Sequence, residues 1–365
     1  MNQRLIKLQT WMKENEIEVS FLTSSENVFY LSGYFTDPHE RLLALVVFQE
    51  KEPFLVCPAM EVPDAKRSSW EHEIIGYSDI DNPWELIFKS IQNRNHPILK
   101  VAIEKEHMNV ERYEQLLGLF PKASFISAEE KLRMLRMIKD AKELKIIEEA
   151  CALADYAVEF GANEIKEGKT ELDILNALEY AIKQKGVTEM SFSTMVLTGT
   201  NAASPHGTPG QTKIQKGDLV LFDLGVVVDR YCSDITRTVA FGDINDKQKE
   251  IYDTVLKAQL AAIEASKPGV RAAEVDLTAR RIISDAGYGE FFPHRLGHGL
   301  GISVHEYPSL TETNGLIIEE GMVYTIEPGI YVPNVAGVRI EDDVFITADG
   351  AAILTKFPKE LQIIK

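Results

Sequence analysis

The chain has 365 residues, of which 45% are hydrophobic and 26% charged, a composition typical of soluble globular proteins. This length exceeds what one hydrophobic core usually supports, so two domains are expected. The formal net charge of −17 argues against nucleic acid or an anionic membrane surface as a partner. No apolar run approaches the roughly 20 residues of a membrane-spanning helix. The first residues lack the apolar core of a secretory signal and the three cysteines are scattered, so a cytoplasmic location is expected.

Residues 1–128 are predicted to form an α/β domain. An amphipathic helix is expected from about Arg4 to Asn15, and short apolar runs such as VSFLTSS and LLALVVFQE, separated by turn residues, predict strands. The charged stretch EEKLRMLRMIKD, residues 129–140, predicts a linker helix.

Residues 141–365 are predicted to form a second domain, with helices packed on one face of a curved, mostly antiparallel sheet. A long helix with a buried stripe is expected to begin near Asp140. A second helix is expected to begin after Thr170, with Asp173 at the capping-box position, and to stop at Gly186. Strands dominate from residue 191 onward, apart from one helical block at about 246–286.

Four acidic residues follow or precede apolar runs that are typical of strands: Asp223, Asp234, Glu327 and Glu341. A carboxylate in the core of a strand is costly unless a positive charge compensates it. Four carboxylates and one neutral imidazole would carry four negative charges, which two divalent cations balance. Oxygen ligands with a single nitrogen suit Mn²⁺ and, less selectively, Co²⁺ or Zn²⁺. The pattern therefore predicts a dinuclear metal site.

Each residue also has an ordinary interpretation. Asp229 in VVVDRY is expected to be a hairpin turn, and Asp342 and Asp343 are expected to be solvated. A single histidine in a glycine-rich loop is more often structural than catalytic. The metal site is favoured because the acids occur together with four histidines in loops rich in glycine or proline, namely His206, His294, His298 and His305.

Five motifs follow one another along the chain: FDLG, SDITRT, GHGLG, TIEPG and RIED. In this order they resemble the pita-bread metallopeptidases, a family that includes aminopeptidase P, prolidase and methionine aminopeptidase. The stretch LTSSENVFYLSGY resembles the start of the creatinase-type N-terminal domain, which methionine aminopeptidases lack. The resemblance implies an α+β fold, in which a C-terminal pita-bread catalytic domain follows a smaller α/β creatinase-type domain.

The resemblance also implies the metal ligands and the activity. Asp223 would chelate one metal ion, Asp234 and Glu341 would bridge both, and His298 and Glu327 would complete the second. Glu327 would also act as the proton shuttle when a shared water attacks the peptide carbonyl. The proline-specific branch has both domains and all five ligands, so hydrolysis of Xaa-Pro dipeptides, the prolidase reaction, is expected.

Two other functions stay open. An aminopeptidase P would release the first residue from longer Xaa-Pro peptides, and it would need an open route beyond the proline subsite. A non-catalytic binding module on the same fold would be expected to have lost metal ligands, whereas this chain keeps all five.

Further residues match accessory positions of the family. His206 and His305 are expected to stabilise the oxyanion, and His294, four residues before His298, is expected to contact the substrate. Arg339, just before the IED stretch, corresponds to an arginine that braces the site.

One position departs from the pattern of some prolidases, which carry an arginine two residues after the proline of the HE.P stretch. Here Leu310 takes that position after Pro308, so Arg295 is the candidate for binding the substrate carboxylate.

The loop GYFTDPHERL, residues 33–42, is expected to be a mobile lid, although a solvated turn is the ordinary alternative. Related prolidases are dimers whose N-terminal domains lean towards the neighbour's cleft. A homodimer is therefore expected, in which Asp37 and His39 contact the residue before proline in the partner's site.

Overall fold

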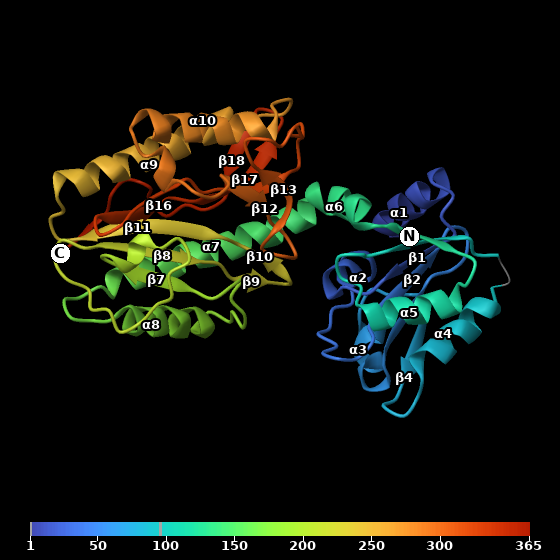
Figure 1. The fold of residues 1–365 in the computed structure, drawn as a ribbon. Coiled ribbons are helices and arrows are strands. Elements are labelled where there is room, and N and C mark those ends of the chain that lie inside the picture. Colours follow the sequence, from blue (N-terminus) through green and yellow to red (C-terminus); the bar gives the residue numbers. More distant parts are fainter. Residues whose placement is uncertain (1, 95–96) are drawn as a thin grey trace. The chain divides into compact units, whose positions relative to one another are not determined.

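The computed structural model describes residues 2–94 and 97–365, which form two compact units divided between Arg136 and Met137. The division falls within helix α6 (Glu129–Met137), which lies in the stretch expected to be a linker (Figure 1). Within the described residues, no helix has both the length and the apolar character that crossing a bilayer requires.

The first unit is built on a mixed six-stranded sheet in the order β4-β3-β2-β1-β5-β6. The two pairings that involve β2 are antiparallel and the other three are parallel. The strands are β1 Val19–Leu22, β2 Ala44–Phe48, β3 Phe54–Pro58, β4 Glu73–Tyr77, β5 Lys100–Ile103 and β6 Ser124–Ser127. The helices are α1 Gln3–Glu14, α2 Ser25–Ser32, α3 Val62–Arg67, α4 Pro83–Gln92 and α5 Val110–Leu119. Helix α1 confirms the helix predicted from Arg4 to Asn15.

The second unit contains four long helices: α7 Ala141–Asn163, α8 Glu171–Gln184, α9 Asp246–Ala265 and α10 Ala272–Asp285. Thr170 and Asp173 form the predicted capping box of α8. The predicted helical block at 246–286 is two helices, because Pro268 cannot continue the first and Gly269, with φ of 88°, turns the chain.

The strands of this unit form a four-stranded sheet, β19-β11-β8-β7, a five-stranded sheet, β13-β12-β14-β17-β18, and two short ribbons, β9-β10 and β15-β16. All pairings are antiparallel except that of β11 with β19. The bounds are β7 Met195–Thr198, β8 Leu219–Leu224, β9 Val227–Val228, β10 Tyr231–Cys232, β11 Ile235–Phe241, β12 Gly297–Gly299, β13 Glu306–Leu310, β14 Val323–Ile326, β15 Gly329–Val332, β16 Ala336–Arg339, β17 Asp342–Thr347, β18 Gly350–Ile353 and β19 Ile363–Ile364.

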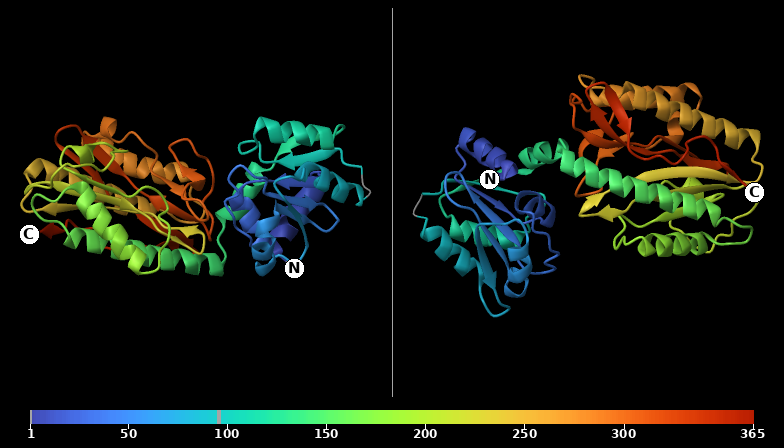
Figure 2. Two further views of the ribbon diagram at one scale, coloured as in Figure 1. Left: turned by 90° about the horizontal axis from the view of Figure 1, so that it is seen from below. Right: turned by 180° about the vertical axis from the view of Figure 1, so that it is seen from behind.

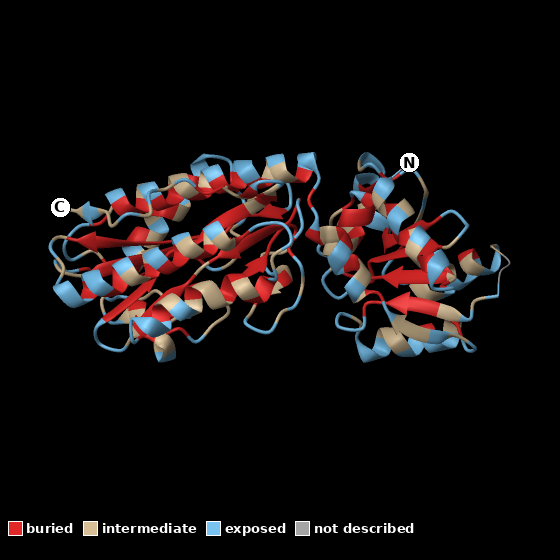
Figure 3. Cartoon of the chain, turned by 90° about the horizontal axis from the view of Figure 1, so that it is seen from above, coloured by how far each residue is buried: buried red, intermediate tan, exposed pale blue. Residues whose placement is uncertain are grey.

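Each helix pair covers one sheet of the second unit. One hydrophobic core joins α7 and α8 to β8 and β11, and α7 runs along this sheet (Figure 2). A second core joins α9 and α10 to β14, β16 and β17. Figure 3 shows buried residues on the sides of the helices that face the sheets and exposed residues on their outer sides. The two sheets lie between the helix pairs, where polar side chains are shielded from water.

Candidate metal centre

The two sheets of the second unit meet at one isolated bridge, between Thr236 of β11 and Glu341, which directly precedes β17. Asp223 of β8 lies opposite Thr236 in the strand register. Asp234 directly precedes β11, and Glu327 directly follows β14. Acids that are far apart in the sequence therefore gather where strands of both sheets end.

His298 lies in strand β12, so the prediction that all four histidines of this unit occupy loops is wrong for His298. Its two glycine neighbours permit the pairing. A Cβ atom on Gly297 would lie 1.9 Å from the carbonyl oxygen of Thr325, and one on Gly299 would lie 2.3 Å from that of Tyr307. Only glycine allows the neighbouring strands to come this close.

The hydrogen bonds of His298 select one tautomer. Its Nδ1 lies 3.1 Å from the carbonyl oxygen of Gly299, so Nδ1–H donates and, in the neutral ring, Nε2 carries the lone pair. That Nε2 lies 3.3 Å from Glu327 Oε1 and 3.7 Å from Asp234 Oδ2. A lone pair that faces carboxylate oxygens is repelled unless a cation lies between them, and this tautomer is the one that metal-bound histidines use.

The buried acids also require a positive charge. Asp234 Oδ1 is buried without a hydrogen-bond partner. Burial, followed by the nearby Glu341 and Asp223 carboxylates, raises the pKa of Asp234 well above its usual range. Burial and then Glu327 and Asp223 raise the pKa of Glu341 in the same way. Ligand atoms of Asp234, His298 and Glu341 lie within 4.8 Å of one another. This donor set fits divalent cations, which would relieve the repulsion.

Glu327 differs from the other acids. Burial raises its pKa, but without a metal ion a hydrogen bond from a protonated His298 ring, followed by the charges of His298, His294 and Arg339, outweighs burial and brings the pKa to about 2. Its Oε1 also accepts a hydrogen bond from Thr325 Oγ1 at 3.2 Å. Glu327 is thus held as a carboxylate beside the imidazole of His298.

Arg339 is the buried cation beside this cluster. Its Nη2 donates to Asp223 Oδ2, its Nε donates to Thr236 Oγ1 at 3.0 Å, and its Nη1 donates to the hydroxyl of Tyr331 at 2.7 Å. Thr236 Oγ1 in turn donates to Glu341 Oε2 at 2.6 Å. Arg339 and Thr236 therefore link Asp223 to Glu341 through a continuous chain of hydrogen bonds.

Sequence reasoning missed Thr236 and Tyr331. A signal for Thr236 exists, since it follows Asp234 by two residues in SDITRT, the spacing of side chains on one face of a strand. Tyr331 lies four residues after Glu327 in TIEPGIYV, and no spacing rule connects the two across the turn.

One pocket of about 690 Å³ contains every predicted site residue of the second unit. These are Asp223, Asp234, His298, Glu327, Glu341, His206, His294, Arg295, His305 and Arg339. Apolar side chains that were not predicted complete its wall, among them Phe192, Met195 and Val304. The pocket is thus lined by both charged and apolar side chains.

The accessory histidines differ in their environment. His206 and His305 are exposed residues of the pocket. The His305 ring stands perpendicular to that of His298, with 4.3 Å between the ring centres. Although the residue is exposed overall, the pocket partly encloses its imidazole. This desolvation, followed by the charges of His298 and Arg295, lowers the pKa of His305 to about 4, so its ring is neutral at pH 7.

His294 has both ring nitrogens engaged within the protein. Nδ1 lies 2.8 Å from the carbonyl oxygen of Arg295 and acts as the donor. Nε2 lies 2.9 Å from the hydroxyl of Tyr331, which accepts from Arg339 and so gives its own proton to His294. Neither ring nitrogen of His294 is thus left for a substrate, and the ring also packs against those of Phe292 and Tyr331. Arg295, beside it, donates from Nη1 to Ser309 Oγ at 3.3 Å.

The other two predicted site residues, Asp37 and His39, belong to the first unit. The His39 backbone N–H donates to Asp37 Oδ1 at 3.1 Å, and His39 has a φ of 52°. Their side chains are 74% and 73% exposed, respectively. Asp37 thus precedes an exposed turn at residues 38–41, in which the Arg41 backbone N–H donates to the Pro38 carbonyl oxygen at 2.9 Å.

Asp342 and Asp343 are fully buried, so the prediction that they are solvated is wrong. Asp343 Oδ2 accepts from the Asp234 backbone N–H at 2.8 Å and from Cys151 Sγ at 3.3 Å. Strand β17 lies between β14 and β18 inside the five-stranded sheet, and helices cover this sheet. The prediction for Asp229 is confirmed, because it forms the turn between β9 and β10 with a φ of 44°.

Comparison with known proteins agrees with this geometry. Residues 145–348 match Metallopeptidase family M24, and residues 4–138 match the Creatinase/Prolidase N-terminal domain. An Xaa-Pro dipeptidase from Lactobacillus helveticus is 47% identical over 362 residues, which cover 99% of this chain and 98% of the relative.

Two solved structures share the whole architecture. The prolidase from Pyrococcus horikoshii has a TM-score of 0.91 at 39% identity, and the match covers 99% of this chain and 100% of that one. The Xaa-Pro dipeptidase from Bacillus anthracis has a TM-score of 0.93 at 33% identity, with 99% of both chains covered. The predicted α+β fold, with a pita-bread domain after a creatinase-type domain, is confirmed. The chain belongs to metallopeptidase family M24 and carries the creatinase/prolidase N-terminal domain.

Proposed function

We propose that this metallopeptidase hydrolyses the Xaa-Pro bond of dipeptides. The observation that carries the proposal is that one pocket contains the carboxylate–imidazole cluster together with Arg295. A guanidinium beside the hydrolytic centre can bind the free carboxylate that a dipeptide has next to its scissile bond. The names of the relatives, Xaa-Pro dipeptidase and prolidase, support the same substrate class.

The residues that would hold two divalent cations are Asp223, Asp234, His298, Glu327 and Glu341. We propose Mn²⁺, because four carboxylates and one imidazole offer mainly hard oxygen ligands, and Co²⁺ or Zn²⁺ suit the same set less selectively. When bound, the two ions would supply a water of lowered pKa and polarise the scissile carbonyl.

The protein's own groups would then move protons and stabilise charge. Glu327, which is proposed as the proton shuttle, would take a proton from the attacking water and pass it to the proline nitrogen. His305 is neutral at pH 7 and can donate an N–H to the developing oxyanion, as can His206. Proline has no amide N–H and a fixed φ, so a pocket without an acceptor for that N–H would favour it.

The test compares Leu-Pro with Leu-Pro-Gly after the metal content of the purified enzyme has been measured. We expect bound metal and a higher kcat/KM for the dipeptide. Faster release of leucine from the tripeptide would identify an aminopeptidase P. A purified protein that neither holds metal nor hydrolyses either peptide would be identified as a binding module.

Arg295→Ala is expected to raise KM for Leu-Pro about tenfold to a hundredfold, the range for losing a charged hydrogen bond. KM for the amide Leu-Pro-NH₂ should change little, because the amide has no carboxylate for Arg295 to bind. Arg281→Ala, which removes an exposed arginine of α10, is the matched control. Equal changes in KM for both substrates would exclude the proposed role of Arg295.

We further propose a cytoplasmic homodimer in which the loop at residues 33–42 closes over the partner's pocket. Cys57, Cys151 and Cys232 are free thiols, as a reducing compartment favours. Asp37 and His39 are exposed and available to a second molecule. Sedimentation should give the mass of two 41.0 kDa chains. The mass of a single chain would contradict the dimer.

Asp37→Ser combined with His39→Ser is expected to change the order of kcat/KM among Leu-Pro, Arg-Pro and Asp-Pro, because it removes two polar groups proposed to face the first residue. The metal content should stay unchanged. Glu50→Ser combined with Lys51→Ser, in the exposed turn between β2 and β3, is the control. If the order of kcat/KM among the three substrates stays unchanged, the loop is an ordinary turn without a role in substrate selection.

A further inference from the structure

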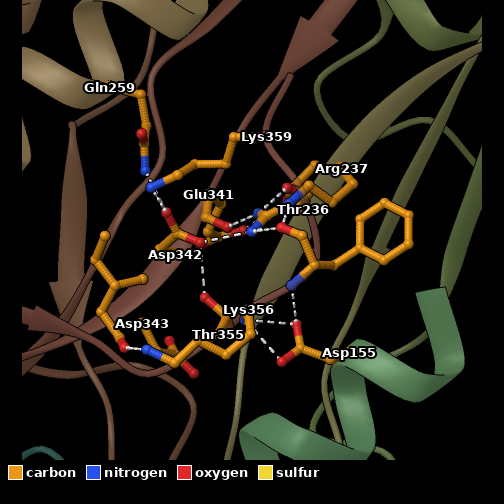
Figure 4. Close-up of polar contacts among 12 residues, drawn as sticks. Asp155, Thr236, Arg237, Gln259, Glu341, Asp342, Asp343, Thr355, Lys356 and Lys359 are labelled. Carbon is orange, nitrogen blue, oxygen red and sulfur yellow. Dashed lines mark hydrogen bonds and ion pairs between the residues drawn. The ribbon is translucent and has the colours of Figure 1, made fainter. Parts of the chain in front are cut away.

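A second polar cluster adjoins the candidate ligands without lining the pocket (Figure 4). Its centre is an ion pair between Arg237 Nη2 and Asp342 Oδ1 at 2.6 Å, and the two side chains are 1% and 0% exposed. Each belongs to a residue next to the site, since Arg237 follows Thr236 and Asp342 follows Glu341. A buried pair is costly unless its remaining hydrogen-bonding capacity is also used.

Arg237 uses all five of its N–H donors. Nε and Nη2 donate to the carbonyl oxygen of Phe357, at 3.0 and 2.8 Å, and Nη2 also donates to Asp342. Nη1 donates to the carbonyl oxygens of Thr236, at 3.0 Å, and of Glu341. A lysine offers only three donors from one atom, so it could not replace this planar set.

Asp342 is equally saturated. Besides Arg237, its Oδ1 accepts from Thr355 Oγ1 at 2.7 Å, and its Oδ2 accepts from Gln259 Nε2 at 2.6 Å and from Lys359 Nζ at 2.7 Å. These four bonds fill the carboxylate's acceptor sites. The cluster therefore ties α9 and residues 355–359 to the main chain beside Glu341.

Glu341 is fixed by its two neighbours in β11. Its backbone N–H donates to the carbonyl oxygen of Thr236 at 3.0 Å, and its own carbonyl oxygen accepts from Arg237. Its side chain accepts from Thr236 Oγ1. A displacement of Arg237 would move the Glu341 main chain and with it the carboxylate that faces Asp234 and His298.

The outer side of the cluster is anchored as well. Asp155 of α7 accepts the backbone N–H groups of Lys356 and Phe357 at 2.7–2.9 Å. Residues 355–359 thus form a fixed support, connected on one side to α7 and on the other to Arg237 and Asp342.

We propose that Arg237 and Asp342, supported by residues 355–359, are positioning residues that hold Glu341 for metal binding. This inference rests on the proposed role of Glu341 as a metal ligand. Loss of a residue that orients a ligand typically weakens metal binding about 10- to 100-fold. A purely structural cluster would lower the stability of the fold and leave the metal affinity of the folded protein unchanged.

The experiment measures Mn²⁺ affinity by competition with a chelator, together with the melting temperature of the metal-free protein. Asp342→Asn keeps the shape of the side chain and removes its charge, and Arg237→Lys removes at least two donors. Both are expected to bind Mn²⁺ about 10- to 100-fold more weakly while remaining folded. Thr355→Val should show a smaller loss. Ile283→Val, in the core far from the cluster in sequence, should lower the melting temperature without changing the affinity.

Unchanged Mn²⁺ affinity in Asp342→Asn and Thr355→Val would overturn the proposal, and these two variants decide it if Arg237→Lys does not fold. Glu341→Gln separates this outcome from failure of the ligand assignment. If Glu341→Gln still binds two ions with native affinity, Glu341 is no ligand and the ligand assignment on which this inference rests is wrong, whereas the comparison of Leu-Pro with Leu-Pro-Gly tests the proposed function separately. If it loses metal while Asp342→Asn retains it, only the positioning role fails.

Discussion

Asp234→Ala is expected to bind fewer than two metal ions and to lose hydrolysis of Xaa-Pro dipeptides by about a thousandfold or more, because metal ions supply several kcal/mol of transition-state stabilisation. The physical reason is charge. Asp234 is one of four acids that two divalent cations would neutralise, and its Oδ1 is buried without another partner. Elemental analysis of the dialysed protein and the rate of Leu-Pro hydrolysis check both parts.

The control for Asp234→Ala lies in the preceding turn. Asp229→Asn alters an exposed acid with positive φ, a conformation that asparagine tolerates, so metal content and activity should stay as they are. Two tightly bound ions in Asp234→Ala would show that this carboxylate does not bridge them.

His305→Ala should keep both metal ions and still lose about a hundredfold or more in kcat, close to the 3 kcal/mol measured for removing one oxyanion donor in other enzymes. The same result is expected for His206→Ala. Both side chains are exposed in the pocket and lie outside the proposed ligand set. The measurement is kcat at saturating Leu-Pro, with metal content determined on the same sample.

His107→Ala, an exposed histidine of the first unit, serves as the control for these variants. Because the rings of His298 and His305 are neighbours, the metal content of the two variants shows which histidine is the ligand. If His305→Ala loses metal and His298→Ala keeps it, the ligand histidine has been assigned wrongly.

Local signals explain what could be predicted from the sequence. The capping box of Thr170 and Asp173 predicts the start of α8, because both partners lie within one turn of the helix. The candidate ligands could be predicted because charged residues in apolar runs, set among glycines and prolines, stand out against their local background. The resemblance to the family then supplied their roles.

Long-range pairing explains what could not be predicted. Asp342 and Asp343 have the composition of a solvated turn, yet Asp342 is neutralised by Arg237, which lies 105 residues earlier in the sequence. His298 stands in a three-residue Gly-His-Gly segment that has no strand propensity of its own. Its neighbours β13 and β14 make it a strand. The burial of Asp342 and Asp343 and the strand conformation of His298 therefore depend on pairing with distant segments, which local sequence does not reveal.

The contacts of residues 355–364 have a consequence for biosynthesis. The five candidate ligands are all synthesised by residue 341, but the carbonyl oxygen that holds Arg237 belongs to Phe357, and Ile363 pairs with Ala240 of β11. The supporting frame of the catalytic unit is therefore incomplete until residues 355–364 have left the ribosome. The unit that ends at Arg136 consists of one continuous stretch of chain, so it can fold while translation continues. If Arg237 positions Glu341 as proposed, metal binding at full affinity would become possible only after residue 357 has been synthesised, when the first unit has had time to fold.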